Sequence, residues 1–189
     1  MRTEHDILTL KAVLLYIIGK WSGTQKCDVY HIVKAAFYAQ KYHLARYLYP
    51  LYKDTIVALP YGPAPSDIYD ALKIARGDAS AIRYHQHDGL IQVASPVNFD
   101  SEVFSTDEKP DMDYLSRSQV ECLDDALQTV GKMSFNEIVS TTHQQEWQRA
   151  FNDHNSKKMD MVAIAREEGA DETSLAYLRE SIALDEALV

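Results

Sequence analysis

The chain has 189 residues, 46% of them hydrophobic and 25% charged, which is typical of one globular domain. Its formal net charge is −9 and it has no cluster of Lys and Arg, so a general nucleic-acid-binding protein is not expected. The two cysteines, Cys27 and Cys122, are far apart, which argues against a disulfide framework or a zinc site and favours the cytoplasm. The apolar run at residues 12–18 is too short to cross a bilayer.

Two long helices are predicted for the first quarter of the chain. Over residues 4–21, apolar residues recur with a 3.6-residue period and further apolar residues lie off that face, so we expect a central, buried helix. Residues 28–47 repeat the pattern on one side only. The other side of this second helix is expected to face solvent, and it carries His31, Lys34, Tyr38 and Lys41.

A strand and a proline-rich segment follow. Residues 54–59 are short and β-branched and end at Pro60, which predicts a strand. Residues 60–65 hold three prolines and one glycine, whereas a phosphate-binding loop needs several glycines and free backbone N–H groups. We therefore interpret this segment as a rigid connection between the strand and a short helix. This helix is expected to begin with Ser66 as its cap and to end before Gly77.

The rest of the chain is predicted to be mostly helical. Residues 90–94 and 102–106 are expected to pair as a small hairpin. Ser116 with Gln119, and Ser134 with Glu137, have the spacing of capping boxes at helix starts. These helices are expected to run to Gly131 and to Phe151. Residues 160–189 hold eight acids and two bases and should form two weaker helices separated by Gly169.

These elements predict a mainly α protein with a small β element. We expect a single compact helical domain over residues 1–152. Residues 153–189 are expected to form an acidic helical extension that docks on it.

No complete catalytic or metal-binding motif is present. His85 and His87 would share one face of a strand, as in some metal sites, but no second cluster completes the ligand set, and a surface turn is the alternative. His143 would need a nucleophile and an orienting acid, such as Cys122, Ser140 or Glu146, yet no spacing connects them, so a packing role is the alternative. We predict no catalytic residue, metal or cofactor, and by default a binding protein.

Two spaced motifs do match a known pattern. The first is Tyr61-Gly62-Pro63 followed by Tyr69, and the second is a helix that starts at Ser134 and reaches a His and then a Trp. In this order they make residues 8–151 similar to the Panacea domain of SocA-like antitoxins, found in bacterial and prophage toxin–antitoxin pairs. Ala64 departs mildly from the family pattern, and the acidic extension is not clearly part of it.

The resemblance implies a non-catalytic antitoxin that binds a toxin encoded by the adjacent gene, or a proteolytic adaptor that delivers the toxin to a cellular protease. A DNA-binding regulator and a small metal-dependent hydrolase using His85, His87 or His143 remain alternatives. No membrane or direct nucleic-acid contact is expected. The residues expected to bind the partner are Tyr38, Tyr42, Tyr61, Pro63 and Asp67, and the motif residues expected to be structural are Gly62, Tyr69, Ser134, His143 and Trp147.

Overall fold

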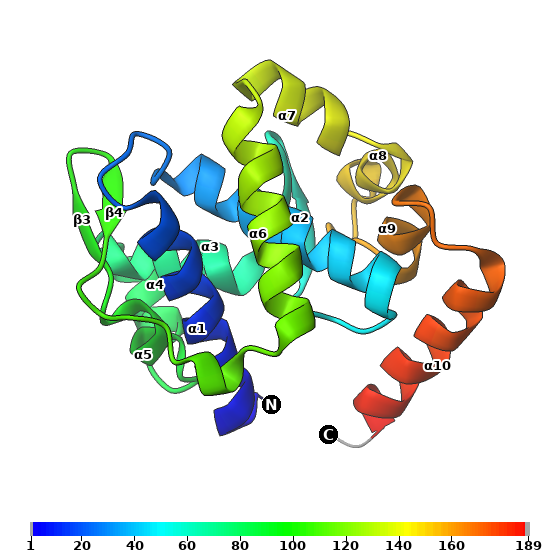
Figure 1. Cartoon of the computed structure of the whole chain (residues 1–189), viewed down its shortest axis with the longest axis horizontal. Coiled ribbons are helices and arrows are strands. Elements are labelled where there is room, and N and C mark those ends of the chain that lie inside the picture. The colour runs from blue at the N-terminus through cyan, green and yellow to red at the C-terminus, as the bar shows by residue number, and fades with distance from the viewer. Residues whose placement is uncertain (1, 188–189) are drawn as a thin grey trace.

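The computed structural model describes residues 2–187, with side chains as far as Asp185, and it is mainly helical. The predicted fold class is confirmed: the described residues form helices with two small antiparallel two-stranded sheets (Figure 1). In chain order the elements are α1 (Glu4–Trp21), α2 (Val29–Tyr47), β1 (Ile56–Leu59), β2 (Gly62–Pro65), α3 (Ser66–Ala75), α4 (Ala79–Tyr84), α5 (Leu90–Ala94), β3 (Asn98–Asp100), β4 (Val103–Ser105), the 3₁₀ turn η1 (Met112–Tyr114), α6 (Arg117–Lys132), α7 (Phe135–Thr142), α8 (Gln145–Asn152), α9 (Met161–Glu167) and α10 (Glu172–Ala187).

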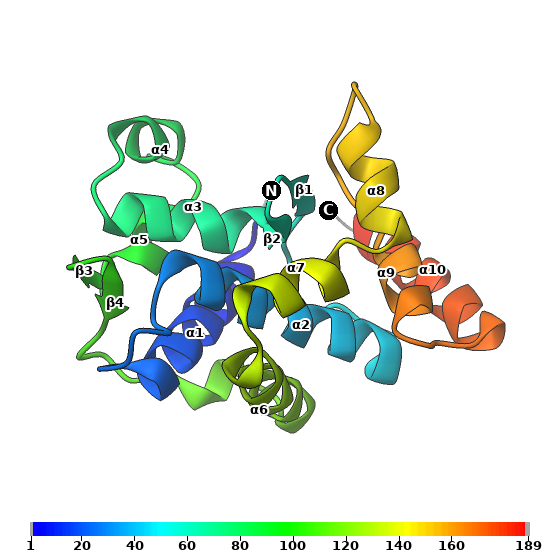
Figure 2. The same ribbon diagram turned by 90° about the horizontal axis from the view of Figure 1, so that it is seen from above.

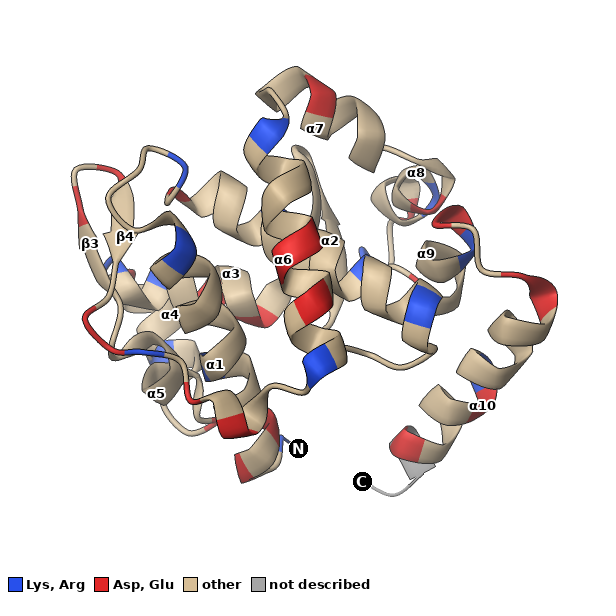
Figure 3. Cartoon of the chain, in the orientation of Figure 1, with Lys and Arg blue, Asp and Glu red and all other residues tan. Residues whose placement is uncertain are grey.

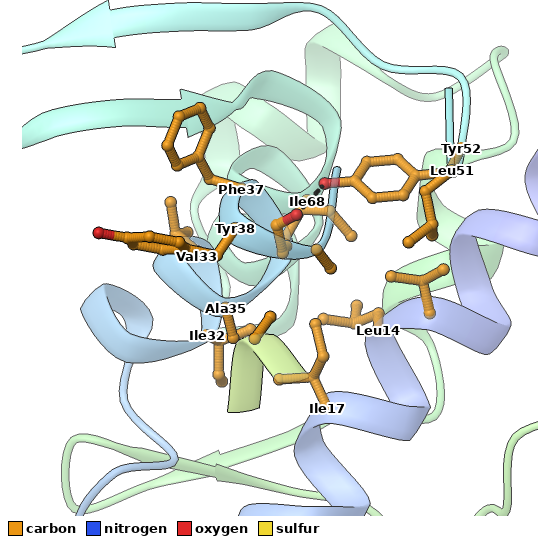
Figure 4. Close-up of a cluster of buried hydrophobic side chains, with 14 of the residues drawn as sticks. Leu14, Ile17, Ile32, Val33, Ala35, Phe37, Tyr38, Leu51, Tyr52 and Ile68 are labelled. Atoms are coloured by element: carbon orange, nitrogen blue, oxygen red, sulfur yellow. Dashed lines mark hydrogen bonds between the residues drawn. The ribbon is translucent and has the colours of Figure 1, made fainter. Parts of the chain in front are cut away.

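Helix α2 is the centre of the molecule. It packs against α1, α3, α6, α9 and β2, and both views place α3, α4 and α5 on one side of it and α8, α9 and α10 on the other (Figures 1 and 2). Leu14 and Ile17 of α1 lie against the part of α2 that carries Ile32 and Ala35 (Figure 4). The apolar repeats of both helices therefore meet in one core.

The prediction of an exposed side on α2 is wrong. Lys34, Tyr38 and Lys41 are all buried, and Tyr42 is buried with them. The reason is tertiary: α6, α9 and the β1–β2 hairpin cover the side that α1 leaves open. Long side chains with polar ends can line such contacts because their stems are apolar.

The proline-rich segment is itself a strand. β2 pairs with β1 in antiparallel register, with Leu59 opposite Gly62, so Pro60 and Tyr61 form a two-residue turn. The other edge of β1 exchanges hydrogen bonds with residues 157–159. In an antiparallel pair, the backbone N–H and C=O groups of successive residues point alternately toward the partner strand and away from it. Pro63 and Pro65 occupy positions that point away from β1, so their missing N–H groups cost no hydrogen bond to β1. The segment predicted to be a rigid connection is therefore the second strand of a β-hairpin.

The predicted pairing of residues 90–94 with 102–106 is also wrong. Residues 90–94 form α5, whose buried Leu90, Val93 and Ala94 have the i, i+3, i+4 spacing of a helix. The hairpin that does form joins β3 to β4, with Phe99 opposite Phe104.

The predicted helix over residues 134–151 is divided into α7 and α8 at His143 and Gln144. The capping box of Ser134 and Glu137 is confirmed at its start. Near its end, the hydroxyls of Thr141 and Thr142 donate to the carbonyls of Glu137 and Ile138 at 2.8 and 2.7 Å. Side chains that bond the preceding turn in this way weaken a helix, and the chain turns at His143.

The C-terminal segment packs on the same core. Residues 157–159 extend the β1 edge, α9 packs against α2, and Leu175 and Leu178 of α10 are buried. The Lys41 ammonium of α2 lies 2.8 Å from the Glu168 carboxylate. The division at residue 152 stays a prediction. Within residues 2–187, no helix is long and apolar enough to cross a membrane.

Candidate functional site

The turn between β1 and β2 rests directly on buried polar groups. Gly62 has φ +97°, which L side chains rarely adopt. A Cβ at this position would lie 2.7 Å from the Thr142 hydroxyl oxygen and 2.9 Å from Lys34 Nζ. The site therefore needs glycine for two reasons, its backbone conformation and its close contacts.

Lys34 fills the space beneath this turn. Its side chain is only 2% exposed, and Nζ donates a hydrogen bond of 2.7 Å to the Pro63 carbonyl. Nζ also lies 5.3 Å from the centre of the Tyr30 ring. No carboxylate within the described residues pairs with it. Burial without a counter-ion disfavours the charged form and lowers the pKa of Lys34 to about 7.

The side chains of His143 and Trp147 complete a group of neighbouring residues beneath the turn. We call Lys34, Gly62, Thr142, His143 and Trp147 the cluster. The His143 and Trp147 rings are stacked with their centres 3.6 Å apart, and the Trp147 indole N–H donates to the Leu59 carbonyl at 3.0 Å. His143 Nε2 is buried and has no hydrogen-bond partner among residues 2–187. Burial and the nearby Lys34 ammonium lower the pKa of His143, so a neutral imidazole is favoured.

A patch of aromatic rings covers the cluster. Tyr61, at the tip of the turn, is 66% exposed, and Phe135, at the start of α7, is 48% exposed. Their ring centres are 5.9 Å apart, and the Tyr30 ring lies 4.8 Å beyond, against Phe135. We call Tyr30, Tyr61 and Phe135 the aromatic surface.

A second feature is a groove of about 1700 Å³ between the start of α3 and the C-terminal helices. Asp67 lies at its wall and forms an ion pair with Arg2. Asp54 is buried beside it and accepts hydrogen bonds from the backbone N–H groups of Asp67 and Ile68, so Asp54 caps α3 from another segment. Burial, together with the Asp67 carboxylate, raises the pKa of Asp54 to about 7. The predicted cap, Ser66, instead donates its hydroxyl to Asp54.

Residues 32–148 match the family model of SocA-like antitoxins with a Panacea domain. The chain belongs to this family. The match covers more than half of the chain and contains Lys34, the Tyr61-Gly62-Pro63 motif, His143 and Trp147. The fold brings Lys34, Gly62, His143 and Trp147 into one cluster. α1, α9 and α10 lie outside the matched residues. No curated protein and no solved structure matches the chain.

Of the residues expected to contact a partner of this Panacea domain, Tyr61 is the exposed one. Tyr38 and Tyr42 are buried, and their hydroxyls bond to those of Thr141 and Thr129. Both rings are part of the core, so alanine at either position would remove core packing as well as a side chain expected to bind the partner. Pro63 and Asp67 are also buried.

The motif residues expected to be structural have different positions. Gly62, His143 and Trp147 belong to the cluster, whereas Ser134 supports it by capping the helix that carries Phe135. Tyr69 lies apart on α3, partly buried, with Lys73 Nζ 5.1 Å from its ring centre.

The alternative catalytic arrangements do not form. His85 and His87 lie in the turn after α4, not on a strand. The His85 ring is instead held by carboxylates on both sides, Asp88 at 2.6 Å and Asp70 at 3.0 Å, so both of its ring nitrogens are already engaged. Within residues 2–187, no group of three or more His, Cys, Asp or Glu side chains is arranged to hold a metal ion.

The possible partners of His143 are engaged elsewhere. Cys122 is buried in α6, Ser140 donates to the Glu137 carbonyl, and the Glu146 carboxylate pairs with Arg149. No hydrogen bond in the described part of the chain joins any of them to the His143 ring.

Sequence reasoning missed Tyr30 as part of the aromatic surface, and Lys34 and Thr142 as members of the cluster beneath it. A signal for Lys34 does exist, because Tyr30, Lys34, Tyr38 and Lys41 recur at helical spacing and form one continuous stripe. An aromatic stripe on a helix that also has an apolar stripe indicates a helix covered on both sides.

Proposed function

We propose that this chain neutralises a toxin, encoded by the adjacent gene, by direct protein–protein contact through the aromatic surface, without catalysis of its own. Membership of the antitoxin family supports the existence of a toxin partner. The observation that carries the proposal is an exposed pair of rings, Tyr61 and Phe135, held over a buried cluster of motif residues.

The physical properties of these rings suit an interface. Tyr and Phe offer large apolar area with few rotatable bonds, and aromatic residues are enriched at interface cores. A Tyr on a two-residue turn above a packed cluster loses little freedom on binding. Residue types of this kind dominate the energy of many interfaces, although they are a minority of the contacts.

The negative charge of the chain would favour its encounter with a basic toxin. The net charge is −9, and acidic residues are distributed over α6, α7 and α10 (Figure 3). A field of this sign accelerates association with a basic partner and has less influence on the lifetime of the complex.

Growth rescue tests the proposal. The adjacent gene is induced alone, with wild-type chain, with Tyr61→Ala and with Phe135→Ala. Tyr84→Ala is the matched control, because Tyr84 is 81% exposed at the end of α4, away from the cluster. We expect rescue by the wild type and the control, and reduced rescue by both surface variants, since removing a central aromatic side chain weakens binding by about 30-fold.

The amount of toxin distinguishes the two modes of neutralisation. If the toxin persists at its normal level while growth recovers, binding alone is responsible. If its level falls only when a protease is present, the chain acts as a proteolytic adaptor. A harmless neighbour, or equal rescue by Tyr61→Ala, Phe135→Ala and Tyr84→Ala, would contradict the proposed interface.

A further inference from the structure

Packing alone does not explain the burial of Lys34. It is among the largest fully buried side chains of the described residues, and no acidic side chain there compensates its charge. Lysine is almost never fully buried unless it is paired, because removing an ammonium from water is costly. A methionine would fill a similar volume without that cost.

The acceptor that Lys34 uses indicates its role. Pro63 follows Gly62, so the 2.7 Å hydrogen bond from Lys34 Nζ holds the chain immediately after the Pro60–Tyr61 turn. The Trp147 indole N–H holds the chain immediately before it, through the Leu59 carbonyl. The turn is therefore held on both sides by side chains from other helices.

The turn decides where the Tyr61 ring lies. Tyr61 is largely exposed, and the ring it contacts is Phe135, itself half exposed. Such a side chain has few contacts of its own, so its position follows from the backbone that carries it. A loosened turn would leave Tyr61 to be ordered at the moment of binding, which lowers affinity.

We propose that Lys34 is a positioning residue of the aromatic surface: its ammonium fixes the Tyr61 turn through the Pro63 carbonyl, and the protein gives up fold stability for this. The inference rests on the proposed function, because it states how the same surface is kept ready for the toxin. The lowered pKa of Lys34 is consistent with an amine that the fold tolerates rather than favours.

The test compares three readouts in Lys34→Met: thermal unfolding, hydrogen exchange of the Gly62 amide, and the Kd for the adjacent gene's product. We expect a higher Tm, exchange at Gly62 faster by about ten-fold, and binding weaker by about ten-fold. A merely structural role would move all three together, with a lower Tm, faster exchange throughout the core and weaker binding, and would overturn the inference. Unchanged exchange and unchanged affinity in Lys34→Met would also overturn it.

Two further variants make the test decisive. Lys73→Met is the control, since Lys73 also lies by a Tyr ring but is paired with Asp70 on α3, and we expect the turn to be unaffected. Trp147→Phe keeps an aromatic ring beside His143 but loses the N–H that holds Leu59, and we expect the same acceleration at Gly62. If Lys34→Met does not fold, unchanged exchange in Trp147→Phe contradicts a turn held by side chains.

The readouts also separate this inference from the proposed function. If the wild type does not bind the neighbour's product, the proposed function fails. The exchange rate at Gly62 still decides whether Lys34 fixes the turn.

Discussion

Replacing Gly62 with alanine gives the most direct check of the packing beneath the turn. The change imposes a left-handed backbone on an L residue and places a Cβ 2.7 Å from the Thr142 hydroxyl and 2.9 Å from Lys34 Nζ. The backbone conformation costs about 1–2 kcal/mol, and pushing buried neighbours aside costs about 1–3 kcal/mol more. We expect Gly62→Ala to lower the free energy of unfolding by about 2–5 kcal/mol.

Gly77→Ala is the matched control. Gly77 has φ +86°, close to that of Gly62, but a Cβ there would have no atom within 4 Å. Urea unfolding of both variants therefore isolates the packing contribution, and Gly62→Ala should be less stable than Gly77→Ala by about 1–3 kcal/mol. Equal losses in the two variants would refute the close contact between the turn and the Lys34 cluster.

Two further predictions concern buried charges. Lys34 has a pKa of 10.5 when unfolded and about 7 when folded, so between these values the unfolded state binds more protons and stability rises with pH. From pH 7 to 8.5 the wild type should gain about 1–2 kcal/mol relative to Lys34→Met in urea unfolding. Titratable groups remote from Lys34 contribute equally to both proteins and cancel in this difference. A constant difference would contradict the lowered pKa. Asp54→Ala removes the acceptor for two N–H groups of α3 and should cost about 1–2 kcal/mol. Asp54→Asn keeps an acceptor oxygen and should cost less, and equal losses in these two variants would show that capping is not the role of Asp54.

Local sequence patterns were sufficient to predict most of the helices. The apolar period of residues 4–21 and the capping boxes at Ser116 and Ser134 specify structure within a few residues of themselves, and all three appear as helices that start where the signals indicate. The mainly helical fold class follows from such local signals.

The errors arise where a distant segment decides the outcome. Nothing near Pro63 in the sequence indicates that Ile56 and Ala58 of β1 bond residues 157–159. Pro65 and Pro63 lie opposite these two residues, at positions where β2 donates no N–H to β1. The α3 cap likewise comes from Asp54, thirteen positions before Asp67. Local spacing cannot reveal partners of this kind.

The candidate site was predicted in part. The motif residues Gly62, His143 and Trp147 were identified from the sequence, and the fold brings them together. Lys34 was placed in solvent because lysine usually lies there, yet it is buried at the centre of the cluster. The burial of a residue type that is usually exposed can be recognised only when the elements that cover it are known. Such exceptions concentrate at functional sites.

The central claim is that this chain binds a toxin through the aromatic surface. Isothermal titration of the purified chain with the product of the adjacent gene tests it most directly, with wild type, Tyr61→Ala and Tyr84→Ala compared at one salt concentration. We predict a saturable complex for the wild type and for Tyr84→Ala, and binding weaker by about 30-fold for Tyr61→Ala. Heat changes that show no binding by the wild type, or identical affinities for all three proteins, would contradict the claim.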